Sequence, residues 1–126
     1  HIVRAALEGI ALSCAELLES MSGDLGRSLT EIKVDGGATA NSLLLETQAD
    51  LLGAPIVRPE IVETTALGAA MLAGLGCGLW SSLDELTRSW REDKRFLPNP
   101  EHFEITSSLR RSWSRAVPLA IAFGEG

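Results

Sequence analysis

Two consecutive glycines, Gly36 and Gly37, join a strand-like run to a helix-like run, and this junction constrains the fold more than any other feature. Residues 29–34 alternate in polarity as a half-buried strand does, and residues 43–52 have helical spacing. In α/β proteins ligands bind where a strand ends and a helix begins, because glycine allows close backbone approach and the helix N-terminus presents unpaired N–H groups. Taken alone, the motif favours a tight turn with no ligand over a binding site.

The order of the predicted elements indicates an α/β layer. An amphipathic helix is expected over residues 1–21, a strand over 29–34, a helix over 41–52, a short strand over 54–59 and a helix over 66–77. This alternation is typical of a small sheet flanked by helices. Because only two strands are evident and a two-stranded sheet is marginal, we expect the chain to be an incomplete part of a larger domain.

Single residues refine these elements. Gly53 is expected to end the second helix as a left-handed cap, and Thr64 or Thr65 is expected to cap the third. Pro55 lacks a ladder donor and therefore predicts an edge strand. Gly68 costs its helix about 1 kcal/mol relative to alanine, so close packing against it is expected.

The remainder of the chain is predicted to be mainly helical. A capping-box pattern predicts a short helix over residues 82–90, and residues 106–117 have helical spacing up to Pro118, which should end or kink the helix. The 126 residues are expected to form one domain, with residues 1–80 as its core and residues 81–126 as a helical C-terminal extension.

Charge and hydropathy exclude two classes of function. The net charge of −6 disfavours a nucleic-acid partner. One basic cluster exists, but acidic residues interrupt it, so it is interpreted as a solvated helix face or loop; its members are Arg88, Arg91, Lys94 and Arg95. No apolar run approaches the roughly 20 residues that span a bilayer. The sequence therefore predicts neither nucleic-acid binding nor a membrane span.

The two cysteines, Cys14 and Cys77, are far apart and lie among apolar neighbours. They are interpreted as buried, reduced thiols of a cytoplasmic protein. No spacing of cysteine and histidine resembles a zinc site, and His1 and His102 are not assigned as ligands. No metal-binding residue is predicted in the chain.

Several blocks of the sequence resemble the FGGY family of carbohydrate kinases. They are residues 1–8 (His-Ile-Val-Arg-Ala-Ala-Leu-Glu), 34–41 (Val-Asp-Gly-Gly-Ala-Thr-Ala-Asn), 58–60 (Arg-Pro-Glu) and 65–70 (Thr-Ala-Leu-Gly-Ala-Ala). Residues 72–80 and 83–86 resemble the members of the family that act on glycerol, and pentulose kinases typically carry Gly-Gly-Gly-Ala where this chain has Asp-Gly-Gly-Ala. The resemblance extends to about residue 96 and weakens afterwards.

This resemblance implies the second half of an actin-like, ribonuclease-H-like ATPase, with a nucleotide bound between two domains. Gly36, Gly37, Ala38 and Asn41 would contact the adenosine side of ATP or ADP. Mg²⁺ would be bound mainly through the nucleotide and the upstream domain. The implied reaction is ATP-dependent phosphorylation of glycerol to glycerol 3-phosphate, and the implied partner is the N-terminal half of the same kinase.

No catalytic residue is assigned in this chain, because the family's catalytic aspartate and first phosphate loop precede the part that matches residue 1. The isolated chain is therefore predicted to be inactive. Asp35 is expected to order the glycine turn by accepting hydrogen bonds from backbone N–H groups rather than to act as a base.

Two other functions are compatible with the sequence. The chain could belong to another FGGY kinase that acts on a pentulose or a similar polyol. It could also be a non-catalytic actin-like module that binds a nucleotide or a partner protein, which exposed sheet edges and an acidic surface would suit. A homo-oligomer is compatible with each of these.

Overall fold

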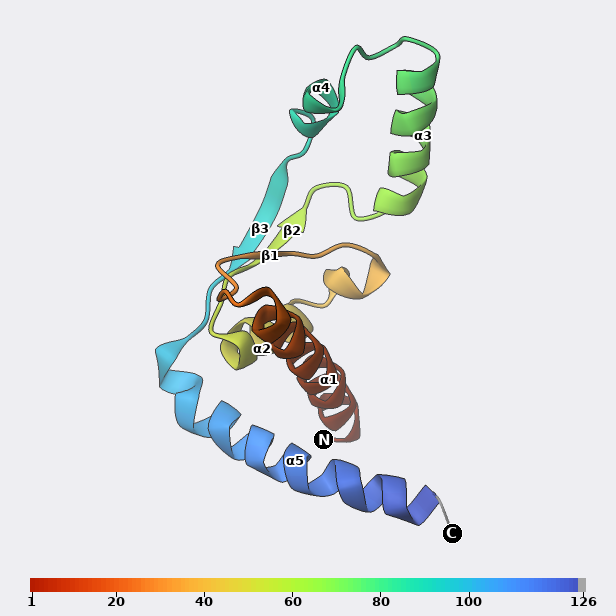
Figure 1. Cartoon of the computed structure of the whole chain (residues 1–126). Coiled ribbons are helices and arrows are strands. Elements are labelled where there is room, and N and C mark those ends of the chain that lie inside the picture. The colour runs from red at the N-terminus through yellow and green to blue at the C-terminus, as the bar shows by residue number, and fades with distance from the viewer. Residues whose placement is uncertain (125–126) are drawn as a thin grey trace.

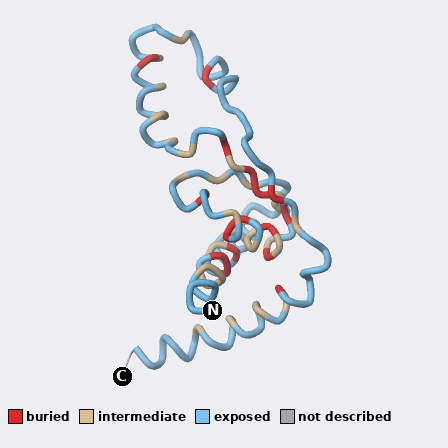
Figure 2. The backbone as a smooth tube through the Cα atoms, turned by 180° about the vertical axis from the view of Figure 1, so that it is seen from behind, coloured by how far each residue is buried: buried red, intermediate tan, exposed pale blue. Residues whose placement is uncertain are grey.

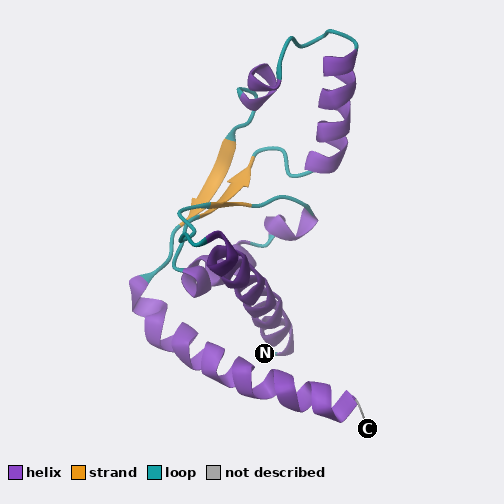
Figure 3. Cartoon of the chain, in the orientation of Figure 1, coloured by secondary structure: helices purple, strands orange, loops and turns teal. Residues whose placement is uncertain are grey.

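The computed structural model describes residues 1–124 as three strands and a set of helices (Figures 1 and 3). In chain order the elements are α1 (Ile2–Leu25), β1 (Ile32–Lys33), the 3-10 helix η1 (Gly37–Ala40), α2 (Ser42–Leu52), β2 (Ile56–Pro59), α3 (Thr64–Gly76), α4 (Leu83–Thr87), β3 (Glu92–Phe96), the 3-10 helix η2 (Pro100–His102) and α5 (Phe103–Gly124). The sheet lies at the middle of the molecule (Figure 1). Helices α1, α2 and α5 lie at one end, and α3 and α4 project from the other.

The sheet has the order β1-β2-β3, with β1 parallel to β2 and β3 antiparallel to it. The prediction that the strand after Pro55 lies at an edge is wrong, because β2 is the central strand. Pro55 precedes the ladder and takes part through its carbonyl, which accepts a hydrogen bond from the Ile32 N–H at 2.9 Å. The missing N–H of proline therefore costs this strand nothing.

The third strand, β3, was not predicted from the sequence. Its residues Glu92–Phe96 are exposed except for Phe96, so they carry no apolar alternation. Arg95 bonds to Glu92 on its own strand at 2.7 Å and to Glu31 just before β1, and these hydrogen bonds raise the pKa of Arg95. The basic cluster is therefore not a helix face, because two of its four members lie on a charged edge strand.

The division of the chain into a core of residues 1–80 and a C-terminal extension of residues 81–126 stays a prediction.

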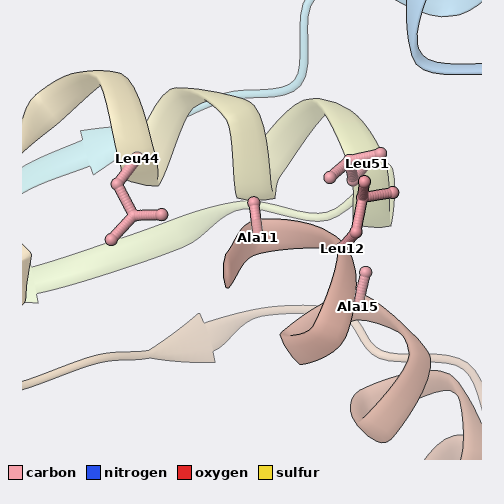
Figure 4. Packing of buried hydrophobic residues seen from close by; sticks show 5 residues of the cluster. All are labelled: Ala11, Leu12, Ala15, Leu44 and Leu51. Atoms are coloured by element: carbon pink, nitrogen blue, oxygen red, sulfur yellow. The ribbon is translucent and has the colours of Figure 1, made fainter. Parts of the chain in front are cut away.

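The core is formed on both sides of α2. One apolar cluster joins α1 to α2, and Figure 4 shows its side chains; they are Ala11, Leu12, Ala15, Leu44 and Leu51. The other joins α2 to the sheet and consists of Leu45, Ala49, Ile56 and Phe96. Most buried residues of the tube in Figure 2 lie in this central region. Helix α2 thus packs against α1 through one face and against the sheet through the other.

Polar contacts connect η2 and α5 to α2 and α1. The Asp50 carboxylate accepts the Asn99 N–H at 2.7 Å and pairs with the His102 ring at 2.7 Å. Arg110 pairs with Glu19 at 2.6 Å. The helix predicted over residues 106–117 is longer in the structure, because α5 begins at Phe103 and continues past Pro118 to Gly124, so Pro118 does not end it. A proline removes one hydrogen bond of the helix, and here that loss does not end it.

Two of the three helix caps predicted from the sequence are confirmed. Gly53 has φ 62°, which confirms it as the left-handed cap of α2. Ser82 accepts the Glu85 N–H and so caps α4, while the Glu85 carboxylate accepts both the N–H and the hydroxyl of Ser81, which lowers the pKa of Glu85. The predicted threonine cap of α3 is wrong, because the N-cap is Glu63 without a side-chain bond.

Helix α3 is largely exposed, and the packing predicted at Gly68 is not observed within residues 1–124. A Cβ at that position would meet nothing within 4 Å. The close approach occurs at Gly74 instead, because a Cβ there would collide with the ring of Trp80. Among the glycines of α3, Gly74 therefore makes a close contact with Trp80, whereas Gly68 makes none.

The two cysteines differ in their surroundings. Cys14 is half-buried on α1, whereas Cys77 is exposed at the end of α3, and both are free thiols. The prediction that both thiols are buried is therefore wrong for Cys77, because α3 lacks a covering layer among residues 1–124. No helix in the same range is long and apolar enough to cross a membrane.

Candidate nucleotide site

The glycine turn lies between β1 and α2 and is closed by its own hydrogen bonds. Gly36 has φ 87° and ψ 166°, a backbone conformation that essentially only glycine adopts. Its carbonyl accepts the Thr39 N–H at 3.0 Å and the Thr39 hydroxyl at 2.7 Å. Its N–H donates to the Val62 carbonyl at 2.8 Å. The turn is therefore an ordered structure joined to the loop that follows β2.

The residues predicted to contact a nucleotide come together on this turn. Gly37, Ala38 and Asn41 are exposed, Gly36 is half-buried, and Thr39 faces inward with 4% of its surface exposed. Gly37 differs from Gly36 in its backbone, because its φ is not positive, whereas a Cβ at either position would meet nothing within 4 Å among residues 1–124. Neither the backbone nor a neighbouring side chain therefore requires glycine at position 37, and the space above it is open to a ligand.

Asn41 has a structural role that the sequence interpretation did not assign. It is the N-cap of α2, and its side-chain oxygen accepts the Leu44 N–H at 3.2 Å. The cap uses the amide oxygen only, so the amide N–H groups remain available as donors to a ligand. Asn41 thus caps α2 through its side-chain oxygen and is also exposed on the surface of the turn.

Asp35 does not have the predicted role. Its carboxylate accepts a hydrogen bond from the Thr64 hydroxyl at the start of α3, whereas the N–H of Gly36 is taken by a backbone carbonyl. Asp35 therefore connects the glycine turn to α3 rather than ordering the turn itself. The reason is positional, because Asp35 and Thr64 follow the ends of neighbouring parallel strands.

Arg58 was missed as a residue of this region. It lies on β2, and its Nη1 donates to the Thr39 carbonyl at 2.9 Å. Its Nε and Nη2 bond to one Asp93 oxygen at 2.7 and 2.6 Å. An arginine within an otherwise apolar strand was the available signal, since a charged side chain there needs a polar partner.

The glycine turn lines neither of two hollows found in the described part of the chain. An apolar groove of about 650 Å³ separates α3 from α4 and is lined by Leu67, Met71, Leu72, Leu83 and Leu86, among others. A shallower one of about 460 Å³ lies between α1 and α5. Within residues 1–124 no group of three or more His, Cys, Asp or Glu side chains is placed to hold a metal ion. The turn is thus an open surface, not part of an enclosed pocket.

The fold and the turn together define a class of protein. The model of the FGGY family of carbohydrate kinases, C-terminal domain, matches residues 1–77, and the chain belongs to this family. Glycerol kinase of Deinococcus radiodurans is 53% identical over 120 residues, which are 95% of this chain and 24% of that protein. Glycerol kinase of Trichlorobacter lovleyi is 56% identical over 117 residues, which are 93% of this chain and 23% of that protein. The chain spans about a quarter of the length of these relatives.

Solved structures have the same fold. Glycerol kinase of Plasmodium falciparum with ADP has a TM-score of 0.74 and 34% identity, and the match covers 94% of this chain and 24% of that one. Xylulose kinase of Lactobacillus acidophilus has a TM-score of 0.81 at 23% identity, with 98% of this chain and 25% of that one covered. The actin-like ATPase fold predicted from the sequence is confirmed, as a small sheet flanked by helices.

Proposed function

We propose that this chain is the nucleotide-binding C-terminal part of a glycerol kinase, which transfers the γ-phosphate of ATP to glycerol. Support comes from glycerol kinases that are 53% and 56% identical to nearly the whole chain and from the structural likeness to a glycerol kinase with ADP. The observation that carries the proposal is Gly37, an exposed glycine with open space above it and no conformational need for glycine.

In this proposal the exposed face of the turn receives the adenosine side of ATP. Gly36 and Gly37 let the backbone lie against the nucleotide, Ala38 offers an apolar contact, and Asn41 donates a hydrogen bond through its amide. Phosphoryl transfer also needs Mg²⁺ and a group that orients the attacking hydroxyl. These are assigned to the preceding part of the kinase and to the nucleotide itself, so the isolated chain is expected to give no turnover.

The rest of the kinase polypeptide is the proposed partner of this chain. Helix α3 is apolar, yet Gly74 is its one buried residue among those described, and the groove between α3 and α4 is open. An apolar helix is normally covered on several sides. The relatives are about four times longer than the matched segment, since the match covers 24% of one of them, so they contain enough chain to cover it. A cytoplasmic location is part of the same proposal.

The experiment that tests the proposal uses the longest natural polypeptide that contains this sequence. ADP release is measured with MgATP and glycerol, xylulose, ribulose or no acceptor. Turnover with glycerol alone supports the proposal, and turnover with a pentulose replaces it by another FGGY sugar kinase. ADP binding without acceptor-dependent turnover would support a non-catalytic nucleotide-binding module instead.

Replacing Asn41 separates its two roles. Asn41→Ser keeps a capping oxygen and removes the amide donors, whereas Asn41→Ala removes both. We expect both variants to raise the KM for ATP about five- to tenfold, the value of one hydrogen bond. Only Asn41→Ala should also destabilise the protein, by about 1 kcal/mol. Steady-state kinetics with each substrate varied in turn and thermal unfolding measure the two effects. An unchanged KM for ATP in Asn41→Ser would count against the assignment.

A further inference from the structure

Arg58 links the central strand of the sheet to the glycine turn. The guanidinium donates to the Thr39 carbonyl at 2.9 Å through Nη1, and to Asp93 on β3 at 2.7 and 2.6 Å through Nε and Nη2. Only 17% of its side-chain surface is exposed, and it also lies 5.7 Å from the centre of the Phe96 ring. This one side chain on β2 therefore connects the turn that follows β1 with the edge strand β3.

The Thr39 carbonyl is the atom through which Arg58 can change the position of the turn. Thr39 lies between Ala38 and Asn41, and its N–H and hydroxyl both bond to Gly36 inside the turn. The bond from Arg58 is the one that connects the carbonyl of this residue to the sheet. Because the planar guanidinium holds a carboxylate and a carbonyl in fixed directions at once, a shift of Arg58 shifts the turn with it.

Asp93 determines where the guanidinium lies. It receives two donors of Arg58 through a single oxygen, and its own side chain is 43% exposed, so it remains hydrated while it orients Arg58. A lysine could not replace Arg58 here, because an ammonium group is a compact point charge and lacks the several donors that a guanidinium holds in one plane. The arrangement is therefore specific to arginine on β2 and a carboxylate on β3.

We propose that Arg58, oriented by Asp93, is a positioning residue that holds residues 37–41 where they contact ATP. This inference rests on the proposed function. Arg58 itself faces the inner side of the turn, where Thr39 is buried, and it acts on the nucleotide only through the turn. Its loss should therefore weaken nucleotide binding and leave glycerol binding unchanged.

The test uses the longest natural polypeptide that contains this sequence, with Arg58→Met, Arg58→Lys and Asp93→Asn. Arg95→Met is the matched control, because Arg95 also forms ion pairs on the sheet but none with the turn. We expect Arg58→Met to raise the KM for ATP and the Kd for ADP about tenfold, the value of hydrogen bonds to a charged group. The KM for glycerol should stay within about twofold, as should all constants of Arg95→Met.

Arg58→Lys and Asp93→Asn keep most of the packing of the wild-type side chains. They test the same inference if Arg58→Met does not fold. Both should raise the KM for ATP by less than Arg58→Met and by more than Arg95→Met. Combining Arg58→Met with Asn41→Ser should raise the Kd for ADP by less than the product of the single effects, because both variants act on the same contact.

The outcomes separate this inference from the proposed function. A wild-type protein with neither turnover nor ADP binding would overturn the proposed function and the inference with it. A wild-type kinase in which Asn41→Ser raises the KM for ATP but folded Arg58 and Asp93 variants do not would overturn the inference alone. An equal rise of the KM values for ATP and glycerol would also overturn it, because it would indicate a general loss of structure.

Discussion

Gly37→Ala is expected to weaken ATP binding by roughly 5- to 150-fold, because a methyl group forced into a close contact costs about 1–3 kcal/mol. The same change should not destabilise the fold. Position 37 has no positive φ and open space around its Cβ direction, so alanine there should add up to about 1 kcal/mol of stability by restricting the unfolded chain. Steady-state kinetics with ATP and glycerol varied separately, together with thermal unfolding, measure both effects.

Gly36→Ala is the matched control, because it lies next to Gly37 but has φ 87°. It should destabilise the protein by about 1–3 kcal/mol, since that backbone region is essentially restricted to glycine. Opposite effects of the two alanines on stability, with a loss of ATP affinity at Gly37, are the expected pattern. A Gly37→Ala enzyme with wild-type KM for ATP would show that no nucleotide lies against this turn.

Leu45→Ala is expected to cause the largest loss of stability, about 2–5 kcal/mol. Leu45 is 1% exposed and packs with Ala49, Ile56 and Phe96 between α2 and the sheet. Its removal leaves a cavity between the two layers that position the glycine turn. Urea denaturation of the variant and the wild-type protein, followed by tryptophan fluorescence, measures the change.

Leu43→Ala provides the comparison for Leu45→Ala. Leu43 lies on the same helix but is 41% exposed, so its truncation should change stability by less than about 1 kcal/mol. Equal effects of the two substitutions would contradict the packing of α2 against the sheet. A loss at Leu45 alone would support the packing of this face of α2 against β2 and β3.

Local signals in the sequence were sufficient for several parts of the fold. The glycine pair, the helical spacing of residues 43–52 and the cap at Gly53 predicted a strand, a turn and a helix in the right order, and the structure confirms them. These features depend on interactions between residues a few positions apart, such as the bond from the Leu44 N–H to Asn41. The sequence therefore contains them directly.

Contacts between distant residues were not predictable in the same way. Strand β3 is charged at four of five positions and was expected to be a helix face or loop. It forms a strand because β2 offers it a free edge, and this also makes β2 central in spite of Pro55. The ion pair from Arg58 to Asp93 spans 35 residues, so only the assembled sheet brings its members together.

The sequence by itself determined the α/β character and the turn at residues 36–41, because both depend on short-range patterns of glycine, apolar spacing and caps. It also indicated the kinase family, through blocks of residues that resemble that family. Only the tertiary structure decided the strand order, the exposure of α3 and the connection of the turn to the sheet through Arg58. These depend on which surfaces meet in space. The partner of a charged or small residue can be far away in the sequence, so it is known only once the fold is known.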